Sequence, residues 1–129
     1  MKLALYIKLK DNTEEVFNFY KKLFDAEEIC MHKYNEYMTK DESKFGKVFH
    51  AEMKIKDSLY LYMGDSFKEQ VPNAYKIVLE VPSLKEANDY FNSLREDGDT
   101  LSEMTKMPYG PTIGEVKDKF GITWNIVAC

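Results

Sequence analysis

The chain has 129 residues, of which 44% are hydrophobic and 14% aromatic, and this suits one soluble domain with a sizeable core. Its 18 basic and 22 acidic side chains are interspersed and give a net charge of -4, which offers no electrostatic support for binding nucleic acid or an anionic membrane. No apolar run approaches the roughly 20 residues that span a bilayer, and the two cysteines do not make a disulfide framework. We therefore expect a cytoplasmic protein whose first apolar stretch is a strand rather than a signal peptide.

The first half of the chain predicts a strand, a helix and three further strands. Residues 3–9 are an apolar, β-compatible run, and Asn12 with Glu15 has the spacing of a capping box that begins a helix over residues 13–24. Three strand candidates follow the helix, at residues 27–37, 48–55 and 58–63.

The second half repeats this order after a linker that we place at residues 64–74. Residues 75–81 predict a strand, and Ser83 with Glu86 forms a second capping box before a helix. Three strand candidates follow it, at residues 100–107, 113–118 and 122–127.

An internal repeat relates the two halves. The capping residues Asn12 and Ser83 are 71 positions apart, and the glutamates that complete the boxes, an aromatic pair and a leucine have the same offset. We therefore predict an α+β fold of two βαβββ repeats, residues 1–63 and 75–129, within one domain covering 1–129. Such halves can form a curved eight-stranded mixed sheet with the helices outside and a hollow that suits a small ligand.

Three segments carry a resemblance to a known family. Residues 6–28 combine a strand, an Asn-bearing turn and a Phe-Tyr pair, residues 49–61 hold a His-Ala-Glu strand with a hairpin, and residues 109–124 hold a closing signature. The chain resembles PhnB-like members of the vicinal-oxygen-chelate (glyoxalase/bleomycin-resistance protein/dioxygenase) superfamily. It departs from them at Lys119, where proline is common, and at Glu115, where arginine is common.

The resemblance implies a homodimer and a family named either glyoxalase-like or methyltransferase-like. The second name gains no support from the sequence, because no glycine-rich nucleotide-binding loop follows a strand. No nucleophile elbow is present either.

The resemblance also implies where a metal would bind. Metal-dependent members of the superfamily take four ligands from the first and last strands of each half, and such sites use imidazole and carboxylate donors. These positions carry Leu5 or Ala4, Lys76, Tyr60 and Asn125. None of them is a usual ligand, so we predict no metal or other cofactor in that site and disfavour a divalent ion. A relocated site at His50 and Glu52 would have two ligands, which are too few for zinc. Cys30 and His32 share another strand face, but without a second Cys or His pair we expect them to have a surface or core role rather than to bind zinc.

His50 is the best general-base candidate, because imidazole titrates near neutral pH and Glu52 or Glu115 could orient it. The alternative interpretation is a hydrogen-bonded strand residue that faces the hollow. Aromatic side chains near it could stack on a flat ligand or simply fill the core. The predicted ligand-binding residues are His50, Glu52, Tyr60, Tyr62, Tyr109, Glu115, Trp124 and Asn125.

The sequence is compatible with three functions. The first is a metal-free protein that binds a small organic molecule, and the second is an enzyme of lyase, dioxygenase or transferase type with a relocated metal or a site centred on His50. The third is a structural or regulatory homodimer without a ligand. The unusual residues at the metal positions favour the first function over the second, and the sequence does not decide whether the protein is catalytic.

Overall fold

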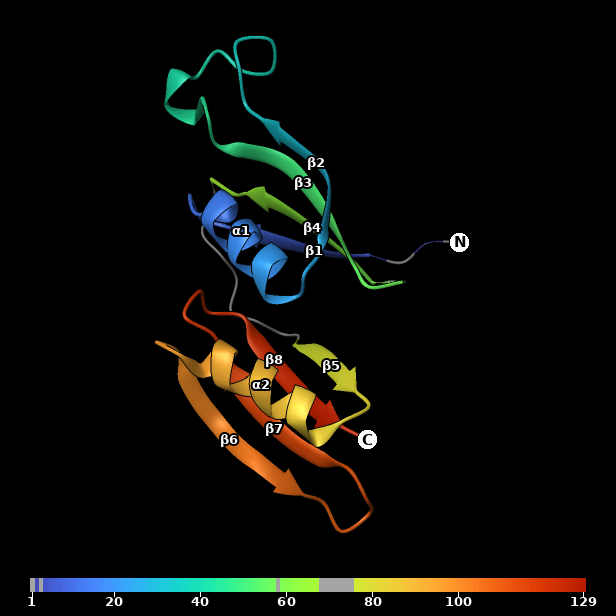
Figure 1. The fold of residues 1–129 in the computed structure, drawn as a ribbon. Helices are drawn as coiled ribbons and strands as arrows, with labels where there is room; N and C mark the ends of the chain where they lie inside the picture. Colours follow the sequence, from blue (N-terminus) through green and yellow to red (C-terminus); the bar gives the residue numbers. More distant parts are fainter. Residues whose placement is uncertain (1, 3, 58, 68–75) are drawn as a thin grey trace. The chain divides into compact units, whose positions relative to one another are not determined.

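The computed structural model describes residues 2, 4–57, 59–67 and 76–129. Ends of three predicted strands, at residues 3, 58 and 75, lie outside the described residues, as does most of the predicted linker. The chain divides into two compact units, Met1–Val71 (unit 1) and Pro72–Cys129 (unit 2), and each holds a sheet with a helix (Figure 1).

Unit 1 has the predicted βαβββ order. Its elements are β1 (Leu5–Leu9), α1 (Thr13–Leu23), β2 (Glu27–Lys33), the short 3₁₀ helix η1 (Glu42–Lys44), β3 (Val48–Ile55) and β4 (Leu59–Asp65). In the described part of the unit, the strands form one mixed sheet in the order β1-β4-β3-β2, in which β1 and β4 are parallel and the other pairs antiparallel. Strand β4 extends through Asp65, two residues past the predicted half-repeat.

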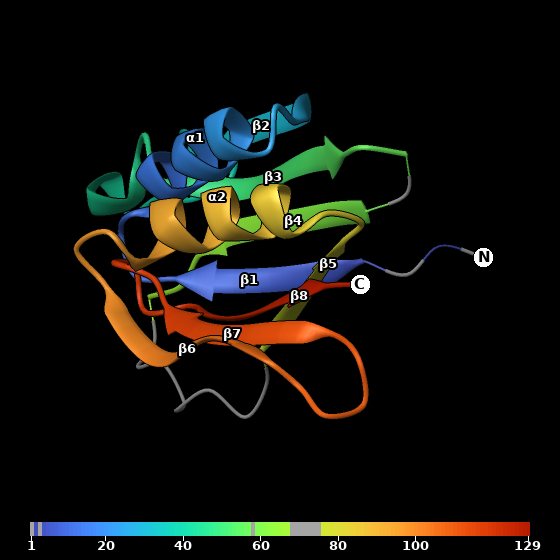
Figure 2. The same cartoon turned by 60° about the horizontal axis from the view of Figure 1, so that its bottom comes forward.

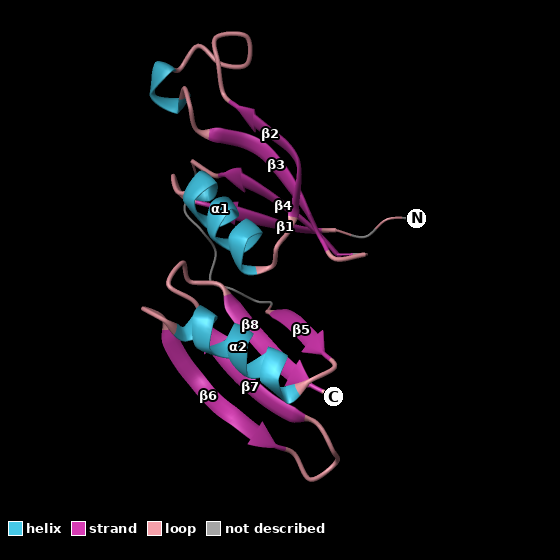
Figure 3. Ribbon diagram, in the orientation of Figure 1, coloured by secondary structure: helices cyan, strands magenta, loops and turns pink. Residues whose placement is uncertain are grey.

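Unit 2 has the same order, which confirms the predicted fold class of two βαβββ units (Figure 3). Its elements are β5 (Ile77–Val81), α2 (Leu84–Arg95), β6 (Asp99–Lys106), β7 (Thr112–Lys117) and β8 (Thr123–Ala128). Among the described residues its sheet runs β5-β8-β7-β6, with β5 and β8 parallel. Neither described α-helix is long and apolar enough to cross a membrane.

The helix of unit 1 covers one face of its sheet, because apolar side chains at helical spacing meet the alternate side chains of the strands (Figure 2). Val16, Phe17 and Tyr20 of α1 are fully buried, and so is Ile7 of β1. Phe19 of the same helix is only partly buried. Full burial of such a side chain contributes about 1.5–3 kcal/mol, so this face holds the unit together. Among the described residues of unit 1, the other face of the sheet is covered by no α-helix.

The two helices begin by different means. Ser83 caps α2 as predicted, since its side chain accepts a hydrogen bond from the Glu86 amide at 3.1 Å. The side chain of Asn12 makes no such bond at α1. Instead the buried carboxylate of Asp65, at the end of β4, accepts from the amides of Thr13 at 3.1 Å and Val48 at 2.8 Å. Asn12 is therefore the N-cap residue, as predicted, but the predicted capping bond from its side chain is wrong, because the distant Asp65 satisfies the first amide of the helix.

Candidate functional site

A cluster of ionisable and aromatic side chains lies on the face of the unit 1 sheet that is opposite α1. We call this face the open face. Strand β3 alternates, so that Ala51 and Met53 are buried while His50 and Glu52 lie on the open face. The register places a tyrosine of β4, Tyr62, directly beside Glu52.

His50 is held between two hydrogen-bonding partners. Its Nε2 lies 2.9 Å from Oε2 of Glu52, and its Nδ1 lies 3.0 Å from the hydroxyl of Tyr6. A carboxylate only accepts hydrogen bonds, so these partners assign the ring proton to Nε2 and leave Nδ1 to accept from the Tyr6 hydroxyl. The strands thus fix both the orientation and the tautomer of the imidazole.

Aromatic rings surround this imidazole. The ring centroid of His50 lies 5.4 Å from that of Tyr6 and 5.3 Å from that of Tyr62, and the two tyrosine rings meet edge to face at 6.1 Å. On the same strand, Tyr60 receives the ammonium group of Lys2 over its ring at 3.9 Å. The cluster is therefore amphipathic, with π-faces beside hydrogen-bonding groups.

The site carries defined charges near neutral pH. The hydrogen bond from His50 is the main reason why the pKa of the Glu52 carboxyl lies below its ordinary value. Burial raises the pKa of the Cys30 thiol, and the neighbouring Glu52 raises it further. Burial likewise raises the pKa of the Tyr6 hydroxyl, and hydrogen bonding to Tyr62 raises that of Lys2. Glu52 is thus ionised, whereas the thiol and the phenol keep their protons.

Cys30 reaches this site because strand β2 contains a bulge. At its start, β2 pairs Glu28 with Met53, and after an irregularity it pairs Cys30 with Glu52. Without the extra residue, the first register would place Ile29 opposite Glu52. The thiol lies 3.6 Å from Oε2 of Glu52 and donates to it.

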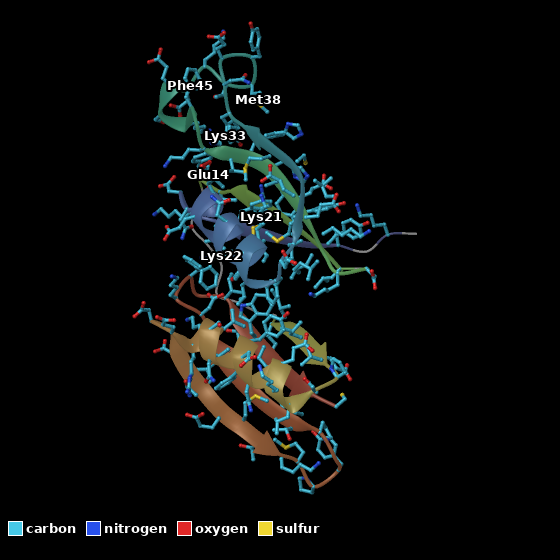
Figure 4. The ribbon with its side chains drawn as sticks, viewed as in Figure 1. Glu14, Lys21, Lys22, Lys33, Met38 and Phe45 are labelled. Carbon is cyan, nitrogen blue, oxygen red and sulfur yellow. The ribbon has the colours of Figure 1, made fainter. Side chains whose placement is uncertain are left out.

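Two ion pairs join this edge strand to α1, on either side of the bulge. Lys21 of α1 pairs with Glu28, and Glu14 of α1 pairs with Lys33. Figure 4 labels Glu14, Lys21 and Lys33 at the junction of the helix and the strand. Exposed pairs contribute little to stability, but these two bind both ends of β2 to the same helix.

The corresponding row of unit 2 has different chemistry. In unit 1, side chains adjacent across the sheet are Tyr6, Tyr62, Glu52 and Cys30. The matching row of unit 2 is Val78, Asn125, Glu115 and Ser102. Two residues before the glutamate, unit 1 has His50 and unit 2 has Ile113. The carboxylate of a glutamate is therefore the only side-chain group that the two rows share. In unit 2 this glutamate, Glu115, forms an ion pair with Lys76, whose Nζ lies 2.8 Å from Oε2.

The structure brings four of the predicted site residues together in unit 1: His50, Glu52, Tyr60 and Tyr62. Glu115 and Asn125 are neighbours in unit 2. Tyr109 is 75% exposed in the turn between β6 and β7. The prediction for Trp124 is corrected, because its side chain is 1% exposed within the core of unit 2 and donates to Asp118 at 2.9 Å.

Sequence reasoning missed Tyr6 and underrated Cys30. The two-residue alternation of β1 identifies Tyr6 once Ile7 and Leu9 are known to be buried. No signal short of the strand register places Cys30 beside Glu52.

The residues at the superfamily's metal positions do not fit a metal. Leu5 lies on the same face of β1 as the buried Ile7, and Lys76 is a cation paired with Glu115. The register makes Tyr62, rather than the predicted Tyr60, the counterpart of Asn125. Neither a phenol nor an amide supplies the imidazole and carboxylate donors that these sites use.

Comparison with known proteins identifies the family. Residues 1–127 match the family described as 3-demethylubiquinone-9 3-methyltransferase. None of the curated proteins compared with the chain matches it.

Solved structures share the fold. A protein from Bacillus cereus, described as a putative 3-demethylubiquinone-9 3-methyltransferase and PhnB protein, is 24% identical over 100% of both chains with a TM-score of 0.85. A protein from Pseudomonas aeruginosa is 22% identical over 99% of this chain and 97% of its own, with a TM-score of 0.90. A glyoxalase/bleomycin resistance protein/dioxygenase family enzyme from Burkholderia phytofirmans is 11% identical over 97% and 95% of the two chains, with a TM-score of 0.69. The chain shares its fold with the PhnB protein and with the glyoxalase/bleomycin resistance protein/dioxygenase family enzyme, and it belongs to the family described as 3-demethylubiquinone-9 3-methyltransferase.

Proposed function

We propose that the protein binds a small aromatic molecule on the open face of the unit 1 sheet, without the metal arrangement usual in its superfamily. The observation that carries this proposal is the pair of tyrosine rings, Tyr6 and Tyr62, around the imidazole of His50, next to the ionised Glu52. A flat ligand can stack on such rings, and each polar tip offers a hydrogen bond that fixes its orientation.

The electrostatics of the face favour a ligand with a hydrogen-bond donor. Glu52 carries a negative charge and accepts from His50 and Cys30. A phenol O–H or an amide N–H of a ligand could replace His50 or Cys30 as a donor to Glu52. An anionic ligand would be repelled by Glu52, although Lys2 lies 4.0 Å from its other oxygen and reduces this effect.

A binding screen with phenols and other hydroxylated aromatic compounds tests the proposal. A compound at 100 times its Kd stabilises the protein by about 2.7 kcal/mol, which thermal unfolding detects easily. Tyr62→Leu removes one ring and should weaken binding by about 0.5–1.5 kcal/mol, or roughly 2- to 13-fold in Kd. Amide chemical shifts should change around Tyr6, His50 and Tyr62.

Tyr37→Leu is the matched control, because Tyr37 is 89% exposed in the loop between β2 and β3. It should leave Kd unchanged. The proposal fails if no compound in the screen raises the melting temperature, or if the shift changes of every bound compound are confined to unit 2.

An acid–base enzyme is the second candidate, favoured by the chain of hydrogen bonds from Tyr6 through His50 to Glu52. Such a chain orients an imidazole for proton transfer. The same screen separates the two functions, since mass spectrometry of the bound compound after incubation shows whether it has been converted. A compound recovered intact supports binding alone.

A further inference from the structure

We propose that Cys30, His50 and Glu52 form a zinc site on the open face of unit 1, distinct from the metal positions usual in the superfamily. The ligand atoms of these three side chains all lie within 4.8 Å of one another. They come from two adjacent strands, β2 and β3, so the backbone of the sheet fixes their spacing. The sequence offered only two ligands here, and the bulge in β2 supplies the third.

The spacing suits a tetrahedral ion. Zn–S bonds of about 2.3 Å and Zn–N or Zn–O bonds of about 2.0–2.2 Å place tetrahedral ligands roughly 3.3–3.7 Å apart. Oε2 of Glu52 lies 3.6 Å from the Cys30 sulfur and 2.9 Å from Nε2 of His50. Small side-chain rotations therefore bring all three donors to bonding distance.

The donor set selects the metal. Zinc binding displaces the proton of the Cys30 thiol into solvent. The resulting thiolate, the imidazole and the carboxylate are together ligands of zinc, whereas magnesium and calcium take oxygen donors. Three protein ligands leave a fourth position for water or another molecule, as in zinc sites that act on a substrate.

Tyr6 completes the site as a positioning residue. With Nε2 of His50 on the metal, the ring proton moves to Nδ1 and is donated to the Tyr6 hydroxyl, 3.0 Å away. Metal-binding histidines nearly always have such a partner on the second nitrogen. Lys2 approaches Oε1 of Glu52, the oxygen that does not face His50 and Cys30, so its charge does not occupy the metal position.

Unit 2 provides an internal comparison. Its matching row has Ser102 in place of the cysteine, and Ile113 stands where the histidine would be. A carboxylate alone, paired with Lys76, is no zinc site. The described row of unit 2 therefore does not repeat the three-ligand set of unit 1.

Titration of the full-length metal-free protein with Zn²⁺ and Co²⁺, in the absence of any organic ligand, tests the site. We expect one ion per chain by calorimetry and a thiolate-to-cobalt charge-transfer band in the near ultraviolet. Cys30→Ser should abolish that band, and His50→Asn and Glu52→Gln should each weaken Zn²⁺ binding by more than the roughly 10- to 100-fold that loss of an outer partner costs. Tyr6→Phe should weaken it by about 10- to 100-fold while the band stays.

The chain offers a matched control for two of the ligands, because it has only two cysteines and two histidines. Cys129→Ser and His32→Asn should keep both the stoichiometry and the band. Far-ultraviolet circular dichroism shows that each variant is folded. The inference is overturned if the wild type takes up no ion, if Cys30→Ser keeps the band, or if either control abolishes it. Because no aromatic ligand is present, this result is separate from the fate of the proposed function.

Discussion

At the scale of single residues, buried carboxylates organise the backbone of each unit. Asp65 joins the start of α1 to the start of β3 through two amides. Asp118 accepts from the amides of Phe120 and Ile122 and from the indole of Trp124. Buried carboxylates are costly unless they are hydrogen-bonded, and each of these two has at least two donors.

Asp65→Asn should destabilise the protein by about 1–3 kcal/mol, since an amide side chain can accept from only one of the two backbone N–H groups and leaves the other unsatisfied. Urea denaturation followed by circular dichroism measures the change. Asn12→Ala is the control. It would cost about 1 kcal/mol at an ordinary cap, but here we expect a change within about 0.5 kcal/mol. A loss at Asn12 equal to that at Asp65 would contradict the assignment of the cap.

At the scale of elements, the sequence predicts the order and type of every strand and α-helix that the structure describes, because alternation and helical spacing are local properties. It fails where distant residues decide. Asp65 replaces Asn12 at the start of α1, and the bulge turns Cys30 toward Glu52. Trp124 was assigned to the ligand face because residue type alone does not say which face of β8 is covered by helix.

Packing of α2 on its sheet depends on a close approach at Gly114 of β7. A Cβ at this position would lie 2.6 Å from the sulfur of Met104 and 2.8 Å from the ring of Phe91. Phe91 belongs to α2 and is buried. A residue with a side chain at position 114 of β7 would therefore fit only if α2 moved away from the sheet.

Gly114→Ala should destabilise the protein by about 1–3 kcal/mol, the usual cost of overpacking. In a Phe91→Leu background the same change should cost less, since the nearest ring atoms are gone, and a double-mutant cycle measures the difference as a coupling free energy. Ser102→Ala, on the exposed strand β6, serves as a neutral comparison. Equal costs in both backgrounds would show that Phe91 does not set the spacing.

At the scale of the whole molecule, two compact units share one chain of 129 residues. Each has its own sheet and its own buried apolar side chains. That they form one domain stays a prediction, as does the homodimer that the resemblance implies. The single tryptophan offers a way to test both, because Trp124 is buried in unit 2 and unit 1 has none.

If the chain unfolds as one domain, Trp124 fluorescence and far-ultraviolet circular dichroism should give the same urea midpoint. Asp65→Asn in unit 1 and Gly114→Ala in unit 2 should each shift both signals together. Separate domains would instead leave the fluorescence midpoint of Asp65→Asn unchanged. A midpoint that rises with protein concentration would support the homodimer, and one that does not would count against it.

The bulge in β2 has a consequence for how relatives of this protein should be compared. One additional backbone residue decides whether a sulfur or an aliphatic side chain stands opposite Glu52. A homologue that kept both Ile29 and Cys30 but formed a regular strand would pair the cysteine with Ala51 and turn its thiol toward the helix. The trait to trace through the family is thus the position of the cysteine relative to the bulge, and a gap placed carelessly at this point of an alignment would hide a change in chemistry.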